Sequence, residues 1–322
     1  MTTITRRAVL GTAAAAPFVH GAVAQERFPS RPITIYVPFP AGGATDVQMR
    51  SFAEAATRHF GQTVLVENRP GAGSTLGAAA VARARPDGYT VSQMTLPALR
   101  LPHMQRMPYD VTKDFTPIIH LTGYLFAVVV RAESPYQTWA DLVADARRRP
   151  GQVRLGNTGA NGTPHLTLVD LAERERIEFV HVPFRGEGDM TPALLGGHIE
   201  GGASGSGVGQ LVDEGKLRFL NVWSRERSPR WPNVPTLIEL GYANMVVTSP
   251  YGLVAPAGLD PAIRRALHDG FKAALYDSAH IATLRRLDQP LEYLDSEAYA
   301  RNMIEVYEQE RQRVERLGLR TG

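Results

Sequence analysis

A strand-to-helix junction near the N-terminus has residue types suited to binding an anion. The apolar run Ile33–Val37 predicts a strand, which Pro38 and Pro40 end. Two glycines then lead to Thr45 and Asp46 at the start of an amphipathic helix. The first N–H groups of a helix have no partner within it, so they attract a carboxylate or phosphate. A helix cap formed by Thr45 or Asp46 explains the same residues equally well.

A second loop of this kind reads Asn157-Thr-Gly-Ala-Asn-Gly-Thr-Pro-His165. It also lies between a predicted strand and a predicted helix, where Thr163 fits the N-cap and Pro164 the first turn. His165 either bonds an oxygen of a ligand or is a structural histidine. Two such loops, one in each half of the chain, predict a clamp that holds a small anion across a cleft.

The other glycine-rich and serine-rich segments do not fit catalytic or cofactor motifs. The segment Gly71–Gly77 reads G-x-G-x-x-x-G, which is not the dinucleotide spacing, so we expect no cofactor, and Ser74 would instead offer a polar contact. Residues 201–207 contain Ser204 but no G-x-S-x-G elbow, so we expect no catalytic residue. Cysteine is absent and the nine histidines are scattered, so we expect no metal site.

Composition places the chain among ordinary globular proteins. Of its 322 residues, 43% are hydrophobic and 21% charged, and the formal net charge is +3. The one cluster of basic residues, Arg147–Arg149, falls at a predicted helix end, where the helix dipole favours cations. The sequence therefore does not indicate nucleic-acid binding.

The N-terminus predicts an export signal at residues 1–24. Arg6 and Arg7 precede a short Ala-rich apolar run, and Ala22-Val-Ala24 offers a small-x-small cleavage pattern. The paired arginines favour the twin-arginine route, although a general secretory signal also explains them. No other run reaches the roughly 20 apolar residues that span a bilayer, so we expect no stable membrane insertion.

After this signal, predicted strands and helices alternate, which is typical of an α/β fold. We expect two doubly wound domains joined by two extended hinge crossings: 25–122 plus 251–322 as domain I and 123–250 as domain II. Thr138 and Asp141 predict a capping box. A final helix near Ser296–Leu317 is expected to pack across domain I, with membrane or partner binding as the alternative.

Seven motifs in this order resemble one protein family. They are Val37–Asp46 (VPFPAGGATD), Val66–Gly73 (VENRPGAG), Arg85–Tyr89 (RPDGY), Lys113–Pro117 (KDFTP), Gly159–His165 (GANGTPH), His181–Gly186 (HVPFRG) and Pro232–Thr236 (PNVPT). The chain is similar in these motifs to the Bug family of periplasmic solute-binding proteins, the receptors of tripartite tricarboxylate transporters.

This resemblance implies a type II periplasmic-binding-protein fold and a periplasmic receptor, not an enzyme, which captures a small carboxylate for membrane transporter subunits. We expect it to act as a monomer. The resemblance also implies that the two loops hold the carboxylate, partly through ordered waters. The expected ligand-binding residues are Phe39, Pro40, Ala41, Gly42, Gly43, Ala44, Thr45, Asp46, Ser74, Thr158, Gly159, Asn161, Gly162, Thr163, His165 and Ser204.

Ser204 stands where many members of that family carry an acidic or amide residue. Its small, uncharged side chain predicts a roomier pocket, and a ligand whose far end is bulkier or less cationic than an amino acid. Two other functions stay open at this point. The protein would present its ligand to a signalling receptor, or it would be an exported hydrolase or lyase with His165 or Asp46 as base.

Overall fold

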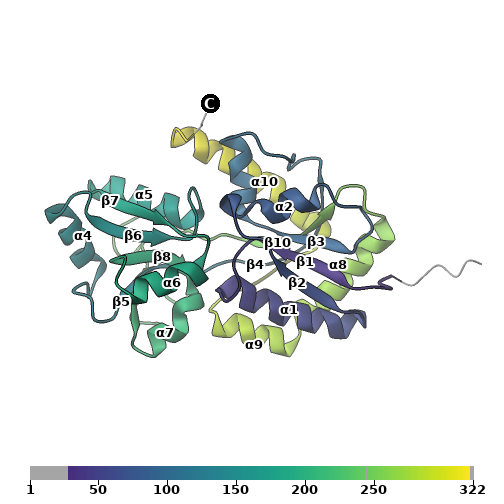
Figure 1. The fold of residues 1–322 in the computed structure, drawn as a ribbon, viewed down its shortest axis with the longest axis horizontal. Helices are drawn as coiled ribbons and strands as arrows, with labels where there is room; N and C mark the ends of the chain where they lie inside the picture. The colour runs from purple at the N-terminus through teal and green to yellow at the C-terminus, as the bar shows by residue number, and fades with distance from the viewer. Residues whose placement is uncertain (1–27, 244, 320–322) are drawn as a thin grey trace, which may run out of the picture.

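The computed structural model describes residues 28–243 and 245–319, which form two α/β lobes side by side (Figure 1). The predicted export signal lies outside the described residues. The first lobe contains a mixed sheet in the order β11-β4-β10-β3-β1-β2. Its strands are β1 (Ile33–Val37), β2 (Val64–Asn68), β3 (Thr90–Met94), β4 (Phe115–Thr122), β10 (Tyr251–Pro256) and β11 (Leu291–Leu294).

The second lobe contains a mixed sheet in the order β7-β6-β8-β5-β9. Its strands are β5 (Phe126–Arg131), β6 (Val153–Asn157), β7 (Phe179–Pro183), β8 (Gly201–Gly205) and β9 (Leu217–Val222). In both lobes the strands with helical crossovers pair in parallel, as β1 does with β2 and β3. The strands through which the chain enters and leaves a lobe pair antiparallel with their neighbours, as β5 does with β8 and β9.

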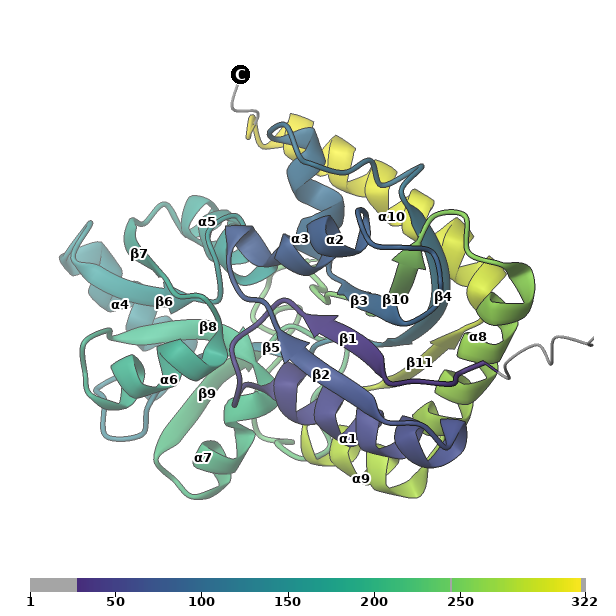
Figure 2. The ribbon, with the colours of Figure 1, turned by 45° about the vertical axis from the view of Figure 1, so that its right-hand side comes forward.

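Helices cover both faces of each sheet. In the first lobe, α2, α3 and α10 lie on one face and α1, α8 and α9 on the other (Figure 2). The helices of the first lobe are α1 (Ala44–Phe60), α2 (Leu76–Val81), α3 (Leu96–Arg100), α8 (Pro261–Leu275), α9 (Ser278–Arg286) and α10 (Ser296–Arg316). Those of the second are α4 (Trp139–Arg148), α5 (Thr163–Glu175), α6 (Glu187–Leu195) and α7 (Gly209–Asp213). Short 3-10 turns cover Ala72–Ser74, Leu101–His103 and Ser206–Val208.

Alternate residues of the central strands belong to different hydrophobic cores. On β5, Val128 and Val130 pack with α4 and α5, while Ala127 and Val129 pack with α6 and α7. Successive side chains of a strand point to opposite faces of its sheet, so a strand that is apolar throughout is buried on both. The alternation of strands and helices predicted from the sequence is confirmed.

Two segments carry the chain between the lobes. The first is the short link from β4 to β5, and the second leads from β9 to β10. They run close together, since a Cβ added to Gly123 in the first would lie 3.7 Å from Pro250 Cα in the second. The domain boundaries at 122/123 and 250/251 remain our proposal.

The sequence missed three elements and overestimated one. It did not indicate α3, α9 or β11. The helix expected over Ser74–Arg85 is shorter, and a 3-10 turn precedes it. Gly73 and Ser74 have φ values of 63° and 64°, which a right-handed helix does not accept. Helix α10 packs against α3 and β4 of the first lobe, as expected.

Candidate functional site

The loop between β1 and α1 is held by contacts of its own. Gly42 has φ 87°, a backbone conformation that favours glycine, and its N–H donates to Asp46 Oδ2 at 3.0 Å. Arg50 Nε and Asn68 Nδ2 also donate to the Asp46 carboxylate. Burial on its own would raise the pKa of Asp46, but these hydrogen bonds outweigh it and lower the pKa. Asp46 therefore braces the loop.

A carboxylate of the second lobe reaches the start of α1. Glu187 is the first residue of α6, and its Oε1 accepts the N–H of Ala44 at 3.2 Å. Ser204 Oγ donates to Glu187 Oε2 at 2.6 Å, and the N–H of Gly207 also donates to this carboxylate. Burial raises the pKa of Glu187 to about 7, although these hydrogen bonds oppose the rise. The start of α1 thus already holds a carboxyl group that the protein supplies.

The loop between β6 and α5 has a different internal arrangement. Gly159 and Asn161 have positive φ values of 123° and 58°. The N–H of Asn161 donates to His165 Nδ1 at 3.1 Å, and that of Gly162 donates to Gly159 O at 3.1 Å. The N-cap, Gly162, makes no side-chain cap, so the N–H of Thr163 has no partner inside the helix. This helix start is open to an outside acceptor.

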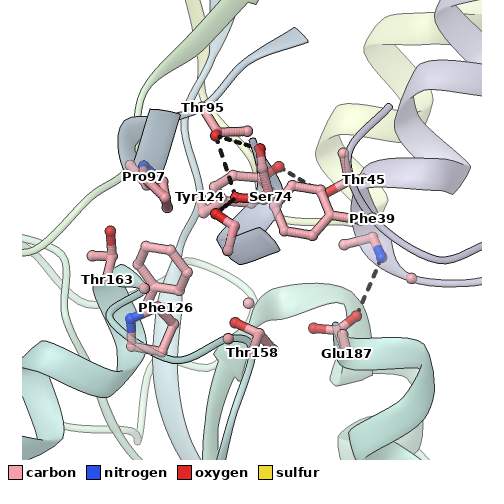
Figure 3. Close-up of a pocket in the computed structure, with 18 of the residues that line it drawn as sticks. Phe39, Thr45, Ser74, Thr95, Pro97, Tyr124, Phe126, Thr158, Thr163 and Glu187 are labelled. Carbon is pink, nitrogen blue, oxygen red and sulfur yellow. Dashed lines mark hydrogen bonds between the residues drawn. The ribbon is translucent and has the colours of Figure 1, made fainter. Parts of the chain in front are cut away.

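The two loops enclose one cavity between the lobes (Figure 3). Its volume is ≈ 60 Å³, several times the roughly 10–15 Å³ that one water needs, so it suits a small molecule. The hydroxyls of Thr45 and Tyr124 share a hydrogen bond of 2.6 Å at its wall. The lining residues are Phe39, Pro40, Gly43, Ala44, Thr45, Gly73, Ser74, Thr95, Pro97, Tyr124, Phe126, Thr158, Gly159, Ala160, Gly162, Thr163, Pro164, Glu187, Gly205 and Ser249.

Most of the residues predicted from the sequence lie around this cavity. Those that line it are Phe39, Pro40, Gly43, Ala44, Thr45, Ser74, Thr158, Gly159, Gly162 and Thr163. Those outside its lining are Ala41, Gly42, Asp46, Asn161, His165 and Ser204. The N–H groups of Gly42 and Ala44 were expected to face a ligand, but both donate to protein carboxylates.

Two expectations about single side chains change. Ser204 is fully buried and donates to Glu187, so the corner expected to be roomy holds a carboxyl group. His165 accepts a hydrogen bond from its own loop, and its ring packs edge-on against His181 at 4.8 Å. Burial lowers the pKa of His165, which fits a neutral, structural histidine.

The sequence reading missed half of the lining. It omitted Gly73, Thr95, Pro97, Tyr124, Phe126, Ala160, Pro164, Glu187, Gly205 and Ser249. One signal was available for Glu187: it is a single acid between two glycines, directly after a predicted strand. Ligands of such sheets sit beyond the carboxyl ends of the strands, so that position was a candidate.

The described residues offer no other chemistry at the cavity. Within 28–243 and 245–319, no group of three or more His, Cys, Asp or Glu side chains could hold a metal ion. In the same part of the chain, no helix is long and apolar enough to cross a membrane. Two α/β lobes with a small cavity between them define a two-lobe ligand-binding protein.

Comparisons with known proteins place the chain in one family. The model of the tripartite tricarboxylate transporter family receptors matches residues 48–319, and the chain belongs to this family of solute-binding receptors. A UPF0065 protein encoded in the gbd 5' region of Cupriavidus necator is 42% identical over 294 residues, covering 91% of this chain and 90% of that protein. BugT of Bordetella pertussis is 33% identical over 276 residues, which cover 84% of this chain and 85% of BugT.

Solved structures agree with this assignment. The periplasmic binding protein BugD has a TM-score of 0.86 at 28% identity, covering 92% of this chain and all of that one. MatC from Rhodopseudomonas palustris with bound malate has a TM-score of 0.82 at 26% identity, and the match covers 88% of this chain and 99% of MatC. A second R. palustris protein, with adipate, has a TM-score of 0.83 at 26% identity, and the match covers 90% of this chain and 98% of that protein. The predicted family and periplasmic-binding-protein fold are confirmed.

Proposed function

We propose that this protein is a periplasmic receptor that captures a small carboxylate in the cavity between its lobes and delivers it to a tripartite tricarboxylate transporter. The observation that carries the proposal is the open start of α5 at the wall of a small cavity that both lobes line. Helix starts attract anions, because their N–H groups and the helix dipole both favour negative charge. The malate and adipate bound by two related structures are carboxylates, which supports this ligand class.

Binding would depend on closure of the lobes. Thr158 and Thr163 come from the second lobe, and Thr45, Ser74 and Thr95 from the first. A ligand held by both groups favours the closed form, which excludes water and strengthens each hydrogen bond to the anion. The two adjacent crossing segments would then act as the hinge.

Several wider features belong to the same proposal. The export signal at residues 1–24 would direct the protein to the periplasm, by the twin-arginine route. The receptor would act as a monomer whose closed form meets the membrane subunits of the transporter. Presentation of the ligand to a signalling receptor remains the second candidate, since it would use the same cavity and the same closure.

An enzymatic role has little support. The proposed bases, Asp46 and His165, lie outside the cavity lining, and each is held in hydrogen bonds within its own loop. A general base must reach the proton that it removes. We therefore do not propose catalysis.

Thermal unfolding with a panel of mono-, di- and tricarboxylates tests the proposal. A ligand that binds only the folded state raises the melting temperature as its concentration rises. Hits are then measured by calorimetry, and the molecule that co-purifies with the protein is identified by mass spectrometry. No shift with any carboxylate, together with no bound acid, would refute carboxylate capture.

Ligand-dependent capture of membrane proteins separates transport from signalling. The purified protein, with and without a carboxylate that binds it, is mixed with solubilised membranes. Recovery of transporter subunits supports the first candidate, and recovery of a sensor protein supports the second.

A further inference from the structure

Glu187 places a carboxyl group of the protein where a ligand carboxylate would otherwise bind. Its Oε1 accepts the N–H of Ala44 at 3.2 Å, at the start of α1. Ser204 and Gly207 supply two more donors from the strand β8 and the turn that follows it. Glu187 also lines the cavity, so part of its carboxyl group faces whatever the cavity holds.

The surroundings of Glu187 contain little positive charge. No Lys, Arg or His is among the described residues that line the cavity. On α1, Asp46 is paired with Arg50, and Arg185, just before α6, pairs with Asp189 of α6 at 2.7 Å. Tyr124, from the first crossing segment, is neutral because burial raises its pKa. An anion beside Glu187 would therefore meet another acidic group without a compensating cation.

The opposite side of the cavity differs. Figure 3 shows Thr163, at the start of α5, across the cavity from Glu187. The N–H of Thr163 has no partner inside its helix. The cavity thus has one end suited to an anion and one end that already contains a carboxyl group.

We propose that Glu187 is a specificity-determining residue that restricts this receptor to ligands with a single carboxylate. The ligand carboxylate binds at the start of α5, and the end that faces Glu187 is neutral or carries a hydrogen-bond donor. A carboxylate can accept about four hydrogen bonds, and Glu187 uses three within the protein, which leaves one for such a donor. This inference rests on the proposed function.

The discrimination is electrostatic. Two carboxylates a few ångströms apart in a site of low polarity repel each other, and one must take up a proton or leave. With an effective dielectric constant of about 20, Coulomb's law predicts that repulsion between two carboxylates about 6 Å apart lowers the affinity for the dicarboxylate on the order of 100-fold. Because burial raises the pKa of Glu187 to about 7, the discrimination should be strongest above neutral pH.

Calorimetry with pairs of ligands matched in chain length tests this inference. Hexanoate is compared with adipate, and butyrate with succinate, at about pH 8. The native protein should bind the monocarboxylate of each pair more tightly. Glu187→Gln should raise the affinity for the dicarboxylate by on the order of 100-fold. Its affinity for the monocarboxylate should stay within a few-fold of that of the native protein. Asp189→Asn, on the same helix but outside the cavity lining, is the matched control and should change neither.

A second measurement covers the case in which Glu187→Gln does not fold. The native protein is titrated at about pH 6 and about pH 8 with a carboxylic acid whose other end is a sulfonate, which stays ionised at both values. Binding should be tighter at the lower pH, where Glu187 is protonated.

Three results would each overturn the inference. The native protein would bind adipate and hexanoate equally well, or the ratio of their affinities would be the same in Glu187→Gln as in the native protein. Alternatively, the native protein would bind the sulfonate ligand equally well at the two pH values. These results would not contradict the proposed function, the capture of a carboxylate. Failure of every carboxylate to bind would instead refute the proposed function, and the inference with it.

Discussion

Arg100 Nη1 donates to Asn161 O at 3.0 Å, which joins the first lobe to the loop that precedes α5 in the second. Arg100 is fully buried and also pairs with Glu310 of α10. A buried guanidinium needs a charged partner and further acceptors, and here they come from two lobes. The position of the second loop therefore depends on α3 and, through Glu310, on the C-terminal helix.

Arg100→Met should weaken both folding and ligand binding. The change leaves Glu310 buried with Arg313 at 3.9 Å as its remaining cation, so the free energy of unfolding should fall by about 3 kcal/mol. Loss of the hydrogen bond to Asn161 should make carboxylate binding roughly tenfold weaker. Urea unfolding and calorimetry measure the two effects. Arg311→Met, on the exposed face of α10, should cost at most about 1 kcal/mol and leave binding unchanged.

Gly207→Ala should prevent the lobes from closing as they do here. A Cβ at Gly207 would lie 1.9 Å from Glu187 Oε1 and 2.6 Å from Ala44 Cβ, so Glu187 or the start of α1 must move. Ligand affinity should fall by at least about tenfold, with the scattering profile of the liganded protein remaining that of an open form. Gln210→Ala, at an exposed position of α7 outside the cavity lining, is the control. Equal affinity in both variants would contradict the steric argument.

Glu187 should make stability depend on pH in a defined direction. Burial raises its pKa from 4.5 to about 7, so between these values the folded protein holds a proton that the unfolded chain has lost. The contribution to the free energy of unfolding is full below pH 4.5 and is lost as pH rises to about 7, a change of about 3 kcal/mol.

Glu187→Gln cannot lose this proton, so its stability relative to the native protein should increase with pH. Urea unfolding of both proteins at about pH 5 and about pH 8 measures the difference. A difference that stays constant across that range would show that Glu187 titrates normally.

Thr138→Ala should affect stability without affecting binding. Thr138 and Asp141 form the capping box at the start of α4, and neither lines the cavity. Loss of the cap should lower the free energy of unfolding by about 1 kcal/mol. Carboxylate affinity should remain that of the native protein, and a change in affinity would mean that α4 takes part in closure.

The sequence was most informative where structure depends on neighbouring residues. The capping box at Thr138 and the helix-end cations at Arg147–Arg149 are both present, because each involves residues within one turn. The strand β5 was also visible, since Phe126–Val130 are apolar without interruption and both faces of this run are buried. The short helix α3, which contains Pro97, has too few residues for a helical period to emerge.

The site was harder to predict because its important contacts join distant residues. Ala44 and Glu187 are 143 positions apart, and Arg100 and Asn161 are 61 apart. Nothing local to Ala44 indicates that its N–H will be occupied by a carboxylate from the other lobe. The glycine-rich loops were recognisable as anion sites in general, but which N–H groups stay open depends on the tertiary fold.

The position of β10 sets an order for assembly during synthesis. This strand lies between β3 and β4, yet it follows the whole second lobe in the chain. A ribosome releases residues from the N-terminus onward, so the sheet of the first lobe has a gap at its centre until residues 251–256 emerge. All five strands of the second lobe are available by then. The lobe encoded in the middle of the gene is therefore the first that can complete its sheet, and the lobe that begins the protein is the last.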